Sequence, residues 1–302
     1  MTYLQLTKRN TLIYLRQKGA VFFSLLTMLI IVMLMVLFLG EMNINAIVDN
    51  LALLPGRDAD TDRENATALV LLWTLAGIIT VNAVNVTNAV YSTMVNDRVD
   101  GRLNSIYTAP VSRMTIAASY VSAAWLCSVM ICTATLAVTD IVCAWSGVGI
   151  FSFATHLELM GLIALNSFVV AAIMYCLAMV VRSPGAFSGI GTVIGTLVGF
   201  LGGIYLPIGS LSDGVAAALK CTPIIYGTAL FRHVMTRDVW NATFDGVPEE
   251  IPTAFARELG IELYVFDRAV SPAVCAAILL VCGAVFLLAG GLLTKYYKKS
   301  DR

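Results

Sequence analysis

The chain has 302 residues, of which 59% are hydrophobic and 13% are charged, and its mean hydropathy is +0.84. Soluble domains contain about 45–50% apolar and about 25% charged residues, so this composition excludes an ordinary soluble protein. The 19 Lys and Arg residues balance the 19 Asp and Glu residues, which argues against the basic surface of a nucleic-acid-binding protein and the high net charge of a disordered chain.

The N-terminal segment 1–19 mixes apolar residues with Lys8, Arg9, Arg16 and Lys18. It is too polar to cross a membrane, and its basic amphipathic character predicts a helix along the inner membrane surface. The alternative is an ordinary charged flank of the first span. The apolar run that follows extends over about 21 residues and lacks a small-x-small cleavage site, so we expect it to remain in the membrane.

Six apolar runs are long enough to cross a hydrocarbon core of about 30 Å as helices. They occupy residues 20–40, 67–92, 114–144, 157–181, 185–206 and 272–294. The predicted fold is an all-α integral membrane protein that forms a single transmembrane domain over residues 1–302.

The orientation follows from the distribution of charge. The N-terminus, the 93–113 loop, Arg182 and the C-terminal tail contain twelve basic and three acidic residues, whereas 41–66 and 232–271 contain six basic and thirteen acidic residues. Because cytoplasmic flanks carry the excess of Lys and Arg, both termini are expected in the cytoplasm and 232–271 outside.

The second run carries a polar stripe. On a helix, Asn82, Asn85, Asn88 and Ser92 fall within about 120° of one another, with Thr74 on the same side. Amides that face lipid are costly, so these side chains are expected to face protein or water. They either line a path across the membrane or form interhelical hydrogen bonds, and the two roles are compatible.

The segment after the second run predicts an amphipathic helix over 96–110. Leu103, Ile106 and Tyr107 repeat at helical spacing, the opposite face is charged, and Pro110 stops the helix. A helix of this kind between two spans is suited to dock on a soluble partner. Farther along, Asp140 and Glu158 lie near outer span ends, where they are either proton-relay groups or solvated end residues.

The fifth run contains Gly191, Gly195, Gly199 and Gly203 at strict four-residue intervals. This spacing removes side chains along one stripe and predicts close packing against another helix. The spacing leaves open whether the partner helix belongs to the same chain or to a second copy.

The region 207–231 is apolar but interrupted by proline and glycine. Ser212 and Thr222 can each cap a helix, and Pro223 is suited to a first helical turn. We therefore predict two short helices that form a re-entrant hairpin from the outer side. The alternative is a long fifth span followed by a surface helix.

Motifs for catalysis are absent from the sequence. It contains no G-x-x-x-x-G-K-[ST] phosphate loop, no H-E-x-x-H helix and no G-x-S-x-G elbow. The seven cysteines form no C-x-x-C pair and two histidines are too sparse for zinc. We expect no catalytic residue, metal site or cofactor in this chain.

Three ordered features resemble the membrane subunits of ABC-2 type ATP-binding-cassette exporters. They are the basic start from Lys8-Arg9-Asn10 to Lys18-Gly19-Ala20-Val21-Phe22-Phe23, the acidic-x-x-Gly loop that ends in Ala109-Pro110-Val111-Ser112-Arg113, and Gly203-Ile204-Tyr205-Leu206-Pro207-Ile208. The resemblance covers nearly the whole chain.

The resemblance implies a permease subunit in a bacterial-type plasma membrane that exports an amphiphilic molecule. A separate ATPase subunit would hold ATP and Mg, and a second permease copy or homologue would complete a dimer. The coupling segment to the ATPase would include Asp97, Arg98, Asp100, Gly101, Arg102 and Arg113, and the re-entrant gate would include Tyr205, Pro207 and Pro223. The alternatives are a small-cation exporter of the same architecture, a membrane-embedded lipid enzyme, and a scaffold or immunity subunit.

Overall fold

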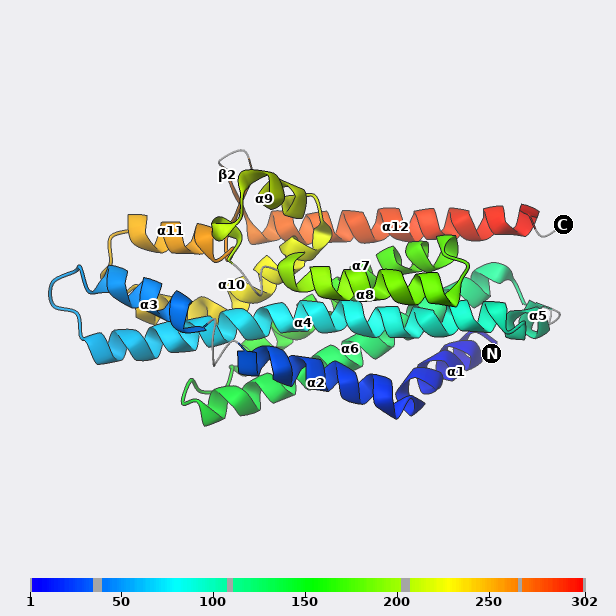
Figure 1. The fold of residues 1–302 in the computed structure, drawn as a ribbon, viewed down its shortest axis with the longest axis horizontal. Helices are drawn as coiled ribbons and strands as arrows, with labels where there is room; N and C mark the ends of the chain where they lie inside the picture. Colours follow the sequence, from blue (N-terminus) through cyan, green and yellow to red (C-terminus); the bar gives the residue numbers. More distant parts are fainter. Residues whose placement is uncertain (1, 35–39, 108–110, 202–206, 266–267, 301–302) are drawn as a thin grey trace.

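The computed structural model describes residues 2–34, 40–107, 111–201, 207–265 and 268–300. They form an elongated helical bundle with one two-stranded sheet (Figure 1). The start of α1 (Thr2–Arg16), α5 (Arg102–Tyr107) and the end of α12 (Pro272–Ser300) lie at the same end of the bundle, which we call the inner end. At the opposite, outer end lie α3 (Gly40–Leu51) and α11 (Glu250–Glu258).

The centre of the bundle is α4 (Ala59–Val99). It has 41 residues, or about 60 Å of helix, which is roughly twice the thickness of a hydrocarbon core. It packs against α6 (Arg113–Trp145), α7 (Phe153–Val180), α8 (Pro184–Leu201) and α10 (Pro223–Thr243). These neighbours bury 83% of its most apolar stretch, as expected for a helix that is apolar on all sides.

Four described helices are long and apolar enough to cross a membrane, namely α4, α6, α7 and α12. A fifth span results if α9 (Asp213–Lys220) and α10, which meet at 89°, count as one. Four of the six expected spans coincide with these helices. The other two remain predictions, because α2 (Lys18–Leu34) is followed by 35–39 and α8 by 202–206, which lie outside the described residues.

The outer segments contain more regular structure than predicted. The outer segment 41–66 includes nearly all of α3, and 232–271 includes the end of α10, all of α11, and the antiparallel strands β1 (Leu263–Val265) and β2 (Arg268–Val270). Ile44, Ile47 and Leu51 of α3 pack in a cluster with residues of α4 and α11. Both α3 and α11 are too short to span a membrane, and they bury apolar side chains in this cluster.

The helices of 207–231 begin as predicted but end differently. Ser212 and Thr222 stand at the N-cap positions of α9 and α10, and Pro223 occupies the first turn of α10. However, α10 continues to Thr243, past Arg232, whose side chain has no exposed surface. The second helix is therefore not short. The sequence places Arg232 in a loop because it is charged, whereas the fold buries it.

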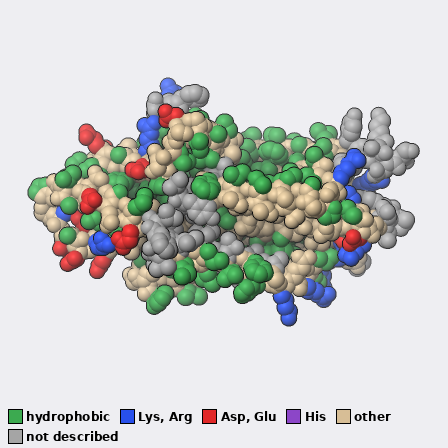
Figure 2. All heavy atoms as spheres, in the orientation of Figure 1, with side chains coloured by type: hydrophobic (Ala, Val, Ile, Leu, Met, Phe, Trp, Pro, Cys, Tyr) green, Lys and Arg blue, Asp and Glu red, His purple; other side chains and the backbone are tan. Residues whose placement is uncertain are grey.

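Charged side chains separate along the long axis of the bundle. Acidic side chains gather at the outer end and basic ones at the inner end, as Figure 2 shows on one face. This separation agrees with the predicted orientation. The assignment of the two ends to the two sides of a membrane stays a prediction.

Candidate functional site

A buried carboxylate connects four helices at the inner end. Asp97, in the last turns of α4, has no exposed surface. Its Oδ2 accepts a hydrogen bond from the Tyr120 hydroxyl of α6 at 2.8 Å and lies 2.9 Å from Arg9 Nη1 of α1. Its Oδ1 lies 3.5 Å from Arg102 Nη1 of α5. Because a buried carboxylate is costly without such partners, these four residues, which we call the inner joint, hold α1 and α5 against the bundle.

Further contacts attach α1 to α6. The Tyr3 hydroxyl lies 2.6 Å from Ser122 Oγ, and Asn10 Nδ2 donates to Ser119 Oγ at 3.4 Å. Sequence reasoning missed the roles of Arg9 and Tyr120, since a basic terminus and a tyrosine within an apolar run carry no signal of a shared partner. The N-terminal helix α1 thus packs on α6 through specific side-chain contacts.

The expected coupling helix over 96–110 is interrupted. The helix α4 extends to Val99, Gly101 has a φ of +72°, and α5 covers only Arg102–Tyr107; residues 108–110 lie outside the described part. Leu103 is 3% exposed and belongs to the large cluster of buried apolar side chains around α4, and Ile106 packs against the same cluster. At Leu103 and Ile106 the apolar stripe therefore contacts this protein itself, and docking of this segment on a partner stays a prediction. Helical spacing identifies a stripe but not what covers it.

The other predicted coupling residues differ in exposure. Arg98 is half-buried and donates to the carbonyl oxygens of Ala178 and Val181 at 3.3 and 3.4 Å, at the carboxyl end of α7, where a cation is favourable. Arg113 begins α6 and is half-buried. Among the side chains that the structure describes at this end of α4 and in α5, the exposed ones are Asn96, Val99, Asp100 and Arg102, which we call the inner face.

The amide stripe of α4 faces other helices of the same chain. Asn82 is fully buried, and its Nδ2 donates to Thr135 Oγ1 of α6 at 2.8 Å. Asn88 is half-buried, and its Oδ1 has no hydrogen-bond partner among the described residues. Ser92 is half-buried, and the Thr74 hydroxyl donates to its own helix at Val70. The stripe thus includes one interhelical hydrogen bond and at least one unsatisfied amide oxygen.

The glycine stripe of α8 packs against this amide stripe. A Cβ atom at Gly191 would lie 2.8 Å from Asn88 Oδ1, and one at Gly195 would lie 3.3 Å from Asn85 Oδ1. Gly199 is buried, and Gly203 lies outside the described residues. At Gly191 and Gly195, therefore, the close approach is made to α4 within one chain.

The predicted gate and outer carboxylates lie toward the outer end. Pro207 is buried and Pro223 begins α10, whereas Tyr205 lies outside the described residues. Asp140 Oδ2 of α6 is 2.8 Å from His156 Nε2 of α7, and Glu158 is 3.1 Å from Arg237 of α10. Both carboxylates therefore have cationic or imidazole partners.

A second buried charge, which the sequence did not indicate, joins the outer region to α4. The Arg232 guanidinium lies 4.3 Å from the centre of the Trp73 ring. Arg232 Nη1 and Trp73 Nε1 both donate to the carbonyl oxygen of Leu259, at 3.0 and 2.7 Å. This arrangement fixes α10 and the end of α11 on the middle of α4.

No group of three or more His, Cys, Asp or Glu side chains within the described ranges is placed to hold a metal ion. Four of the seven cysteines are buried, whereas Cys221 is exposed. The four buried cysteines therefore pack as small apolar residues.

Comparison with known proteins identifies the family. Residues 57–293 match the model of a family described as ABC-2 family transporter protein. Comparison with curated proteins found no significant match.

Proposed function

Because the chain belongs to the ABC-2 family of transporter proteins, we propose that it is the permease subunit of an exporter for amphiphilic molecules, driven by ATP hydrolysis on a separate subunit. The observation that carries the proposal is the family match over 57–293, which includes α4, α6 and α7, most of α12, the inner face and α11. The chain would lie in a bacterial-type plasma membrane with both termini in the cytoplasm.

The inner face is the proposed docking site for the ATPase. It carries exposed Val99 beside Asp100 and Arg102, whose side chains lie 3.3 Å apart. It rests on the inner joint, so force applied to α5 reaches α1, α4 and α6 through Asp97. A rigid connection of this kind suits a permease whose conformations are biased by nucleotide bound elsewhere.

The proposed path runs along α4 and α8. Asn88 of α4 has an unsatisfied amide oxygen. The facing surface of α8 has little side-chain bulk, because Gly191 and Gly195 lie there. The exposed face of α8 carries Val193, Leu197 and Phe200, and a second permease copy would cover it. The region 207–231 would gate the outer end.

Affinity purification of the tagged chain from its native membranes tests the partner. We expect an ATP-binding-cassette ATPase to co-purify. Vesicles that contain the complex should export at least one of three probes, rhodamine 6G, a fluorescent phospholipid or a fluorescent peptide, only when ATP and Mg are supplied. ATP hydrolysis by the purified chain alone, or export without the ATPase, would contradict the proposal.

The break before α5 gives a direct test of docking. Gly101 has a φ of +72°, a conformation that costs a β-branched residue roughly 1–2 kcal/mol or more. Gly101→Val should therefore tilt α5 and reduce ATPase co-purification by several-fold. Gly56→Val is the matched control, because Gly56 has a φ of +83° but lies in the outer loop before α4. Equal losses for both variants would show a general folding defect and remove the support for docking.

The outer carboxylates test the proton-relay and small-cation alternatives. The Asp140–His156 and Glu158–Arg237 pairs are partly exposed, and such pairs contribute about 0–1 kcal/mol. Asp140→Asn and Glu158→Gln should lower thermal stability slightly and leave ATP-driven export of the active probe unchanged. A loss of export with unchanged stability would favour an ion-coupled role for these groups.

A further inference from the structure

The outer end contains a cavity with two adjoining lobes. The first, of about 230 Å³, is lined by α10, α11 and the two residues before β1, and the second, of about 270 Å³, extends toward the start of α12. His233, Ile261 and Glu262 line both lobes. Together the lobes have the size of a small-molecule site.

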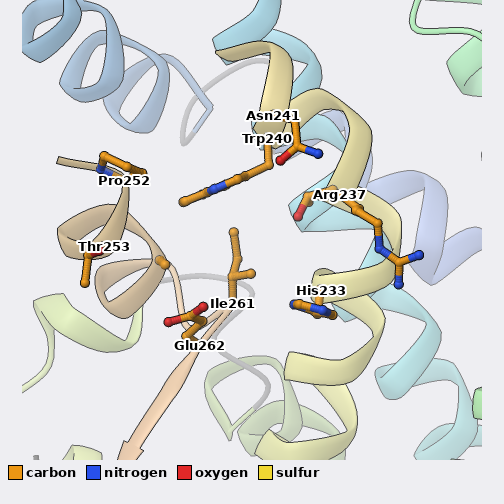
Figure 3. A pocket seen from close by; sticks show the side chains of 10 residues that line it. His233, Arg237, Trp240, Asn241, Pro252, Thr253, Ile261 and Glu262 are labelled. Atoms are coloured by element: carbon orange, nitrogen blue, oxygen red, sulfur yellow. The ribbon is translucent and has the colours of Figure 1, made fainter. Parts of the chain in front are cut away.

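The first lobe is lined by both an indole ring and a carboxylate. Figure 3 shows Trp240 and His233 entering from α10, with Ile261 and Glu262 on the facing wall. The Arg237 side chain points away from the lobe, toward Glu158 at 3.1 Å. The guanidinium is therefore engaged elsewhere. Glu262 is the carboxylate of this lobe, and the other polar side chains in the lining are His233, Thr236, Asn241 and Thr253.

The Glu262 carboxylate is accessible to a ligand. It is exposed, and it accepts a hydrogen bond from the Tyr264 hydroxyl at 3.3 Å. Burial and the neighbouring Glu262 carboxylate raise the pKa of Tyr264, so the hydroxyl remains a neutral donor. An anion that faces an aromatic ring suits a cation, because the ring face attracts positive charge as well.

The second lobe is mostly apolar. Its walls include Leu230 of α10, Leu263 of β1, Val270 of β2, and Pro272 and Cys275 at the start of α12. A ligand that fills both lobes needs a polar head and an apolar body. The outer segments add a net negative field, with thirteen acidic and six basic residues in 41–66 and 232–271, which concentrates cations near the cavity.

We propose that this cavity binds an organic ammonium ion, with its charged head between Trp240 and Glu262 and its apolar part against Leu230, Leu263 and Val270. The use of this cavity as an exit site for exported molecules rests on the proposed function. The binding of an organic ammonium ion does not depend on that function. The inference names the class of exported molecule as lipophilic ammonium compounds.

Calorimetric titration of the full chain in lipid nanodiscs tests binding, with hexyltrimethylammonium as the probe. We expect it to bind at least about tenfold more tightly than hexyl sulfate, because the lobe presents a carboxylate and an aromatic face. Butyltrimethylammonium should bind more weakly, by up to about fourfold for each missing methylene group.

Glu262→Gln should weaken binding of the probe about fivefold or more by removing the charge, and Trp240→Leu should do the same by removing the ring. Glu250→Gln is the matched control, because Glu250 lies in the first turn of α11 outside the lining. Because Glu262 is exposed, Glu262→Gln should fold normally. It therefore tests binding even if Trp240→Leu fails to fold. Equal affinity for hexyl sulfate, or unchanged affinity in Glu262→Gln, would overturn the proposal.

Export assays separate this inference from the proposed function. The chain could bind hexyltrimethylammonium as expected while vesicles with the ATPase do not export it. In that case the cavity is a cation site, and its proposed role in export is wrong. If the vesicles export it and Glu262→Gln changes neither binding nor export, the permease function stands and the cavity is not a cation site.

Discussion

Asp97→Asn should reduce the nucleotide-driven motion of the assembled complex about tenfold, which corresponds to about 1.4 kcal/mol of coupling. The substitution keeps the size of the side chain but removes the charge that faces Arg9 and Arg102 and accepts from Tyr120. Arg9 and Arg102 are 32% and 63% exposed, so both can turn to water. The chain should therefore fold, while α1 and α5 lose their common anchor.

Hydrogen exchange of the purified complex measures this effect without a known substrate. Faster exchange is expected in α1 of the Asp97→Asn variant, together with retained ATPase association and a diminished response of α9 and α10 to an ATP analogue. Glu41→Gln is the matched control, since Glu41 is 56% exposed and also pairs with an arginine, Arg63, but lies in α3 at the outer end. Arg9→Lys keeps the positive charge and should restore much of the response relative to Arg9→Gln. Unchanged exchange and an unchanged nucleotide response in Asp97→Asn would refute the role of the inner joint.

The sequence predicts the parts of the fold that follow from local physics. Hydrophobic run length identified α4, α6, α7 and α12, because a membrane core demands about 20 apolar residues per helix. The preference of Ser and Thr for the N-cap position and of Pro for the first turn located the starts of α9 and α10 at Ser212, Thr222 and Pro223, although neither Ser212 nor Thr222 makes a side-chain capping hydrogen bond.

The remaining features depend on tertiary contacts. Asp97 belongs to a charged face by spacing, yet the fold buries it, because Arg9 lies far away in sequence and close in space. Arg232 is likewise charged and buried toward the outer end, where its guanidinium contacts the Trp73 ring and donates to the carbonyl oxygen of Leu259. Charge alone predicts exposure, and only long-range partners reverse that prediction.

The long helix α4 connects these two buried charges. Asp97 lies near its inner end and Trp73, beneath Arg232, lies nearer its outer end. Most of the apolar length between them is buried, and tightly packed interiors transmit displacement instead of absorbing it. A movement of α5 would therefore reach α10 through α4, which connects the proposed docking face with the proposed gate.

The packing of α8 on α4 yields the second large effect. Gly191→Ala should destabilise the protein by about 1–3 kcal/mol, the usual range for overpacking, because the added Cβ would overlap the Asn88 amide. Gly189→Ala is the matched control, since a Cβ there has nothing within 4 Å. It should be neutral or stabilising by up to about 1 kcal/mol, as alanine is the better helix former.

A second substitution distinguishes this overlap from a general intolerance of α8. Asn88→Ala removes the amide that the new Cβ would meet, so Gly191→Ala combined with Asn88→Ala should recover most of the lost stability. Thermal unfolding of the two single variants and the double variant measures the interaction between the sites. Strict additivity would mean that Gly191 and Asn88 are not in contact. Because Asn88 is also a proposed path residue, a stable double variant with reduced export would assign the amide to substrate passage instead of packing.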